Sequence, residues 1–159
     1  RKYASAYCTI MKKQKSIQAY LYIDAFAGAG VHIKRQTREF VTGSPLNALV
    51  ISPAFSEYHF IDLDGDKVDK LSEIVGKRGD VSIHKGDCNK VLLGEVFPRC
   101  RYEDYRRALC LLDPYGLNVN WEVLQRAGEM KSIEVFYNFM IMDANMNVLW
   151  RSPDKVQTS

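Results

Sequence analysis

Short apolar runs alternate with amphipathic segments along the chain, and this pattern predicts its secondary structure. Runs rich in strand-forming residues predict β-strands over residues 19–25, 58–61, 81–84, 108–112 and 132–139. Between them, apolar residues recur at helical spacing and predict helices over residues 3–17, 44–50, 66–76, 91–97 and 121–127. Strands that alternate with helices pair in parallel through right-handed crossovers. We therefore expect a doubly wound, mostly parallel α/β sheet with helices on both faces.

The length of the chain predicts how many domains it forms. A chain of 159 residues has the size of one domain. We expect residues 1–150 to form this domain and residues 151–159 to form a polar tail. Because the sequence begins at Arg1 and not at a methionine, we also expect a fragment of a longer protein, with a domain that is incomplete at its C-terminal end.

Charge and cysteine content narrow the classes of function only slightly. The net charge is +3, and the basic residues that precede the first acid fit either a solvated helix face or a phosphate-contacting face. The four cysteines form no C-x-x-C pair and have no histidine at ligand spacing, so no metal site is predicted. With neither a signal peptide nor an apolar run of about 18 residues, we expect a cytoplasmic protein with no membrane partner.

The first predicted strand leads directly into a glycine turn. The strand ends at Asp24, and Gly28 and Gly30 follow two residues apart. Without Cβ atoms the backbone can turn tightly and a ligand can approach it closely. Residues 31–42 then show no clear period, so a loop of about a dozen residues is predicted before the next helix. This loop is either a substrate-binding lid or a surface excursion, and its basic residues would suit a polyanionic acceptor; they are Lys34, Arg35 and Arg38.

Acidic residues end four of the five predicted strands. They are Asp24, Asp62 (followed by Asp64), Asp87 and Asp113. Each one alone is common at a turn or a helix cap. The carboxyl ends of parallel strands meet at one edge of a sheet, however, and ligands bind in the crevice outside that edge. Together, the four acids predict a ligand site.

The positions of these residues predict an adenosine ligand without phosphates. Asp62 can accept both ribose hydroxyls, and Leu63 beside it offers apolar surface to adenine. Asp87 can accept a hydrogen bond from an exocyclic amine, with Cys88 packed nearby; Cys88 could equally be a small buried thiol. The turn lacks the third glycine of a dinucleotide fingerprint, and the second strand begins about 30 residues later, where about 20 are usual. A dinucleotide-dependent oxidoreductase is therefore disfavoured.

A resemblance to known proteins rests on these motifs. Asp24, Gly28, Gly30, Asp62, Gly86-Asp87 and Asp113-Pro114-Tyr115 occur in the order found in class I S-adenosylmethionine-dependent methyltransferases, which the chain resembles over about residues 20–140. Residues 22–28, 43–46, 60–62 and 112–116 further resemble the bacterial three-Cys-motif partner protein family. That family is a predicted methyltransferase-like group encoded beside a protein with a three-cysteine motif. The resemblance implies a Rossmann-like methyltransferase domain that binds S-adenosylmethionine.

The resemblance also implies roles for particular residues. The glycine turn would surround the methionine portion of the cofactor, with Asp62 at the ribose and Asp87 at the adenine; the turn residues are Asp24, Phe26, Ala27, Gly28 and Gly30. Asp113, Pro114 and Tyr115 resemble the Asp-Pro-Pro-Tyr motif of amino-methyltransferases, in which the acid and a prolyl carbonyl bind the target amine and the aromatic ring stacks on the target base. Here one proline is missing and Gly116 follows the tyrosine. Tyr115 could alternatively cover the edge of the sheet.

Two features separate the chain from related enzymes. Cytosine-5 methyltransferases need a Pro-Cys pair after the fourth strand, which this sequence lacks, so that class is excluded. After Phe139 there is one apolar segment, residues 140–150, which is predicted to be helical, and no antiparallel hairpin completes the sheet.

These observations predict a methyltransferase that acts on nitrogen of a nucleic acid or a protein partner. The alternative is a non-catalytic, S-adenosylmethionine-binding subunit that associates with a three-cysteine-motif protein.

Overall fold

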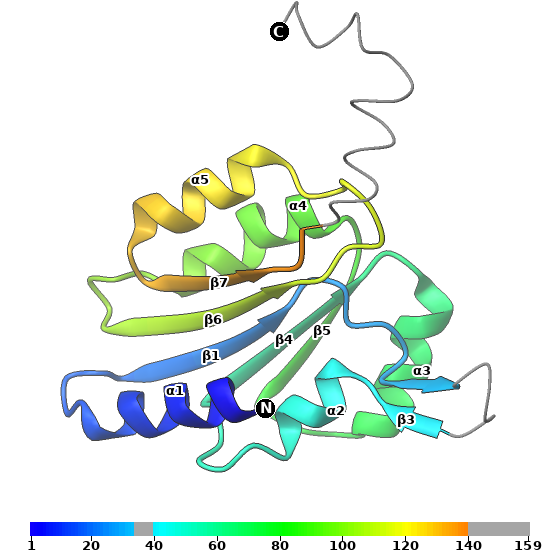
Figure 1. The fold of residues 1–159 in the computed structure, drawn as a ribbon, viewed down its shortest axis with the longest axis horizontal. Helices are drawn as coiled ribbons and strands as arrows, with labels where there is room; N and C mark the ends of the chain where they lie inside the picture. The colour runs from blue at the N-terminus through cyan, green and yellow to red at the C-terminus, as the bar shows by residue number, and fades with distance from the viewer. Residues whose placement is uncertain (34–39, 140–159) are drawn as a thin grey trace, which may run out of the picture.

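The computed structural model describes residues 1–33 and 40–139, and its centre is a five-stranded sheet (Figure 1). The strands are β1 (Ala19–Asp24), β4 (Glu57–Asp62), β5 (Val81–Lys85), β6 (Arg106–Leu112) and β7 (Ile133–Tyr137). They lie in the order β5-β4-β1-β6-β7, and every neighbouring pair is parallel. The five predicted strands and their parallel pairing are therefore confirmed.

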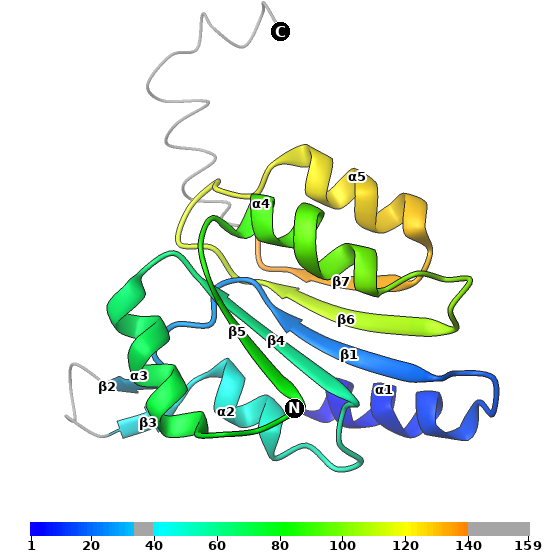
Figure 2. The ribbon, with the colours of Figure 1, turned by 180° about the vertical axis from the view of Figure 1, so that it is seen from behind.

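Helices cover both faces of this sheet (Figures 1 and 2). On one face lie α1 (Lys2–Lys13), α2 (Ser44–Leu49) and α3 (Gly65–Val75). On the other face lie α4 (Cys88–Val91), which continues as a π-helical and then a 3₁₀ segment to Arg99, and α5 (Trp121–Met130). Because both faces are covered, β1 is buried on both sides, which explains its nearly continuous apolar sequence.

The chain reverses direction across the sheet next to β1. After β1 it builds outward through β4 to β5, and it then returns to place β6 on the opposite side of β1 (Figure 2). At such a point the connections leaving neighbouring strands run to opposite sides, which leaves a crevice at their carboxyl ends. The crevice of this sheet is therefore expected between the turns that follow β1 and β6.

The segment after the glycine turn differs from the prediction. Residues 31–42 were predicted as a loop, whereas β2 (Val31–Ile33) and β3 (Phe40–Thr42) pair as antiparallel strands. Their β-branched and aromatic residues favour extended pairing, although three residues a strand are too few to give a clear sequence period. Lys34, Arg35 and Arg38 lie outside the described residues, as do the predicted helix at 140–150 and the polar tail at 151–159.

Element boundaries also differ from the prediction, among them those of the first two helices, and the last helix extends to Met130 rather than Ala127. The first helix ends at Lys13 rather than near Ile17, because Gln14 is extended and the chain turns there into β1. The second helix includes Ser44, and its N-cap is Gly43 rather than Ser44. Among the described residues, no helix has the length and apolar character that crossing a membrane requires.

Candidate functional site

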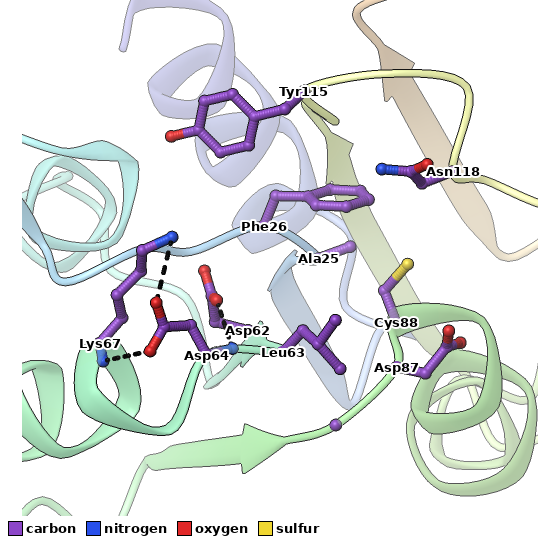
Figure 3. A pocket seen from close by; sticks show the side chains of 11 residues that line it. Ala25, Phe26, Asp62, Leu63, Asp64, Lys67, Asp87, Cys88, Tyr115 and Asn118 are labelled. Atoms are coloured by element: carbon purple, nitrogen blue, oxygen red, sulfur yellow. Dashed lines mark hydrogen bonds and ion pairs between the residues drawn. The ribbon is translucent and has the colours of Figure 1, made fainter.

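A cleft of about 670 Å³ lies at the carboxyl ends of the central strands (Figure 3). Its size is typical of sites for small molecules, roughly 300–1,000 Å³. It is lined by Ala25, Phe26, Asp62, Leu63, Asp64, Lys67, Gly86, Asp87, Cys88, Tyr115 and Asn118. The turns after β1, β4, β5 and β6 all contribute to this wall, as expected for a crevice at the reversal of strand order.

Asp62 joins the glycine turn to the end of β4. Its Oδ2 accepts from the backbone N–H of Gly28 at 2.8 Å, and its Oδ1 accepts from the N–H of Asp64 at 2.9 Å. Gly28 has a φ of 63°, a conformation that favours glycine and that aims its N–H at the carboxylate. Each carboxylate oxygen can accept more than one hydrogen bond. Asp62 therefore keeps acceptor capacity for the hydroxyls of a ligand.

Two apolar side chains face the cleft. Leu63 is 73% exposed although it follows a buried strand, and Phe26 lies across the cleft from it in the view of Figure 3. An exposed apolar side chain beside convergent polar groups is typical of a ligand-binding wall. Leu63 and Phe26 can contact the faces of a planar ring.

Asp87 and Cys88 form the wall on the side of α4. Asp87 is the N-cap of α4, and its Oδ1 accepts from the N–H groups of Asn89 and Lys90. No described residue bonds Oδ2, which remains an acceptor for a ligand amine. Burial, and secondarily the charge of Asp87, raise the pKa of the Cys88 thiol to about 11. The thiol is therefore protonated at neutral pH, and it packs rather than acting as a nucleophile.

Asp24 lies beneath the cleft and does not line it. Its side chain is 0% exposed, and its Oδ1 accepts from the N–H of Phe26 at 3.3 Å. No described residue hydrogen-bonds its Oδ2. Burial raises the pKa of Asp24 to about 6; nearby Asp113 and Asp62 add to the increase, and the Ser44 hydroxyl opposes it. The predicted acid at the end of β1 is thus present, but ligand cannot reach it in this conformation.

The other turn residues support the backbone rather than the cleft. The N–H of Ala27 donates to the carbonyl of Ile61, which ties the turn to β4. Gly30 has a φ of 77°, and a Cβ added there would lie 2.8 Å from Cδ1 of Leu71 in α3. The positive φ and this close approach together favour glycine at position 30. Ala27, Gly28 and Gly30 do not line the cleft, although the resemblance places them beside the cofactor.

The segment after β6 contributes only one of its three predicted residues to the cleft. Tyr115 lines the cleft and is 78% exposed, and Nζ of Lys67 lies 5.8 Å from the centre of its ring. Asp113 is exposed, and its Oδ1 accepts from Nδ2 of Asn138 at 2.7 Å. Pro114 is buried. Asp113 and Pro114 thus flank the cleft and do not line it.

Three polar residues to which the sequence pattern assigned no individual ligand contact also line the cleft, although Asp64 was noted beside Asp62 among the acids at the strand ends. Asp64 is the N-cap of α3 and accepts at Oδ1 from the N–H groups of Asp66 and Lys67; Nζ of Lys67 lies 3.7 Å from its Oδ2. The spacing of Asp64 and Lys67 is visible in the sequence, although it is typical of many surface helices. Asn118 lies in the irregular segment between β6 and α5, where no periodic pattern indicates its direction.

Comparisons with known proteins identify the fold and no family. No family model matches the chain, and no curated protein matches it. Protein LPL1258 from Legionella pneumophila str. Philadelphia 1, described by the family model DUF519, has a crystal structure similar to this one, with a TM-score of 0.62 at 12% sequence identity. The match covers 84% of this chain and 62% of that protein, so the chain spans less than two thirds of its length. At this identity the similarity shows the α/β fold alone.

Proposed function

We propose that the cleft binds S-adenosylmethionine and that the protein is a methyltransferase. One observation carries the proposal: Asp62, Leu63, Asp87 and Cys88, from the ends of two neighbouring strands, line one cleft beside the glycine turn. An acid for a ribose, an apolar wall for a base and an acid for an exocyclic amine therefore face the same space. This is the set of groups that an adenosine needs, in the crevice where open α/β sheets bind ligands.

The charge of the cleft supports a cationic cofactor over a dinucleotide. Three carboxylates and one ammonium line it, namely Asp62, Asp64, Asp87 and Lys67. S-adenosylmethionine carries a sulfonium and no phosphate, and when bound it supplies an electrophilic methyl group. A pyrophosphate would meet the three carboxylates with Lys67 as its only lining cation. The residues present therefore fit the sulfonium cofactor.

The acceptor side of the proposal rests on Tyr115. Its ring lines the cleft and is mostly exposed, so it can stack on a planar acceptor and hold a nitrogen near the cofactor. Asp113 and the Pro114 carbonyl would hydrogen-bond the acceptor amine. The acceptor is a nitrogen atom of a nucleic acid or of a protein partner.

A second candidate function is cofactor binding without catalysis. Asp113 does not line the cleft, and its Oδ1 accepts from Asn138, so the acid that would bind the acceptor amine lies outside the cofactor cleft. The protein would then be a subunit that binds S-adenosylmethionine and associates with a three-cysteine-motif protein.

Calorimetric titration with S-adenosylmethionine and S-adenosylhomocysteine tests the cofactor site. In Asp87→Asn the cap of α4 is kept, since asparagine caps helices as well as aspartate, but Oδ2 is replaced by an amide donor that faces the ligand amine. We expect micromolar binding to the unmodified protein and a loss of at least about tenfold, or ~1.4 kcal/mol, in the variant. Asp66→Asn is the matched control, because Asp66 lies in the first turn of α3, close to the cleft in sequence, but does not line the cleft. Absence of binding by the folded protein would overturn the proposal.

Transfer of a radiolabelled methyl group then separates the two candidate functions. The protein, alone and with a three-cysteine-motif partner, is incubated with labelled S-adenosylmethionine and with RNA, DNA or protein. Label transferred to one of them, lost in Tyr115→Ala and retained in Tyr115→Phe, supports the enzyme. Cofactor binding without transfer to any of these acceptors supports the non-catalytic subunit.

A further inference from the structure

A buried asparagine fixes the segment that closes one side of the cleft. Asn89, in the first turn of α4, is 7% exposed. Its Nδ2 donates to the carbonyl oxygen of Asn118 at 3.0 Å, and its Oδ1 accepts from the N–H of Asn120 at 2.8 Å. The amide N–H and the amide oxygen of Asn89 therefore both bond the backbone of a segment about 30 positions later in the chain. A buried polar side chain with these bonds fixes backbone position, because breaking either bond leaves a buried group unpaired.

This attachment places the side chain of Asn118 in the cleft. Asn118 lines the cleft together with Asp87 and Cys88 (Figure 3). The hydrogen bond from Asn89 goes to the backbone carbonyl of Asn118, and among the described residues no hydrogen bond to the Asn118 side-chain amide is found. The amide, with one donor group and one acceptor, thus lines the same cleft as Asp87, whose Oδ2 is bonded by no described residue.

We propose that Asn118 is a specificity-determining residue that recognises the adenine base, and that Asn89 positions it. This role of Asn118 rests on the cofactor site proposed above. An asparagine amide can pair with adenine through two hydrogen bonds, accepting from the 6-amino group and donating to N7. The 6-amino group has two hydrogens, so Oδ2 of Asp87 receives the second one. Guanine and hypoxanthine carry an oxygen at position 6, which would face two acceptors and be rejected.

Replacement of one ligand atom tests this assignment. S-adenosylhomocysteine and its 7-deaza analogue, in which a C–H group replaces N7, are titrated calorimetrically into the protein and its variants. We expect the analogue to bind the unmodified protein about fivefold more weakly, the effect of one lost hydrogen bond. In Asn118→Ala the two ligands bind equally, because the group that senses N7 is gone. In Asn89→Ala the ratio also approaches one, although Asn118 is intact.

Controls separate a positioning role from a general loss of structure. Asn138→Ala removes another asparagine that bonds the segment after β6 but lies outside the cleft, and it retains the fivefold ratio. Asn118 is exposed, so its alanine variant folds and carries the test even where Asn89→Ala does not. Equal binding of the two ligands by the unmodified protein, or an unchanged ratio in Asn118→Ala, would overturn this assignment and leave the cofactor site standing. If S-adenosylhomocysteine does not bind at all, both proposals fail.

Discussion

The buried carboxylate of Asp24 makes stability at neutral pH lower than it would be with a neutral side chain. Asp24 is fully buried, and burial raises its pKa from 3.8 to about 6. A shift of about two pH units corresponds to roughly 3 kcal/mol of difference between the two protonation states. Asparagine has the same shape, keeps an oxygen to accept from Phe26 and carries no charge. We therefore expect Asp24→Asn to stabilise the fold by up to about 3 kcal/mol at pH 7.5.

The sign of the pH dependence follows from the direction of the shift. Because the folded protein holds the proton of Asp24 more tightly than the unfolded chain, folding is not penalised below pH 3.8. The penalty develops as pH rises from 3.8 to about 6, and it is complete above that value. The advantage of Asp24→Asn is thus largest at neutral pH and vanishes near pH 4.

Denaturant unfolding of the two proteins between pH 4 and pH 8 measures this difference. Comparing the proteins at each pH cancels the titration of groups that are distant from Asp24. Equal stabilities across the range, or an advantage that grows as the pH falls, would refute the reasoning. The same substitution removes a negative charge beneath the cleft, and we expect it to weaken S-adenosylmethionine binding, the usual cost of stabilising a functional site.

Three further predictions address the turn, the cleft and the opposite end of the sheet. Gly30→Ala forces a left-handed φ on alanine and places its Cβ 2.8 Å from Cδ1 of Leu71, so denaturant unfolding should show a loss of about 2 kcal/mol or more in the free energy of unfolding. The control Gly128→Ala, at an exposed helical position with free space around it, should leave stability unchanged or increase it. S-adenosylmethionine should bind more tightly than S-adenosylhomocysteine at low salt, and calorimetry at rising ionic strength should show the two affinities converging as the carboxylates of the cleft are screened. His59, buried against His84, has a pKa lowered to about 4 mainly by burial, so between pH 6.5 and about 4 its protonation should cost roughly 3 kcal/mol of stability, opposite in sign to the contribution of Asp24 over much of that range. Denaturant unfolding should therefore show a neutral His59→Gln variant gaining stability relative to the unmodified protein as the pH falls towards 4.

The sequence by itself determined the strands and two acids of the candidate site. The central strands β1, β4 and β6 are largely buried, and β5 and β7 each have half-buried apolar residues, so their apolar positions are a local signal. Parallel order follows from the intervening helices. Asp62 and Asp87 sit at strand ends, and the position of a strand end is set within a few residues of sequence. That is why local pattern placed both of them at the cleft, with Leu63 and Cys88 beside them.

Only the tertiary structure decided which neighbours these residues meet. Asp24 and Asp62 both end strands, yet Asp24 is covered by the turn and by Ser44, whereas Asp62 stays open to the cleft. Gly30 reads in sequence as a ligand-binding glycine, but the close approach of Leu71, 41 positions later, gives it a packing role. Asn118 enters the cleft through bonds from Asn89. Burial and long-range hydrogen bonds depend on how distant segments meet, and the local sequence pattern does not encode that arrangement.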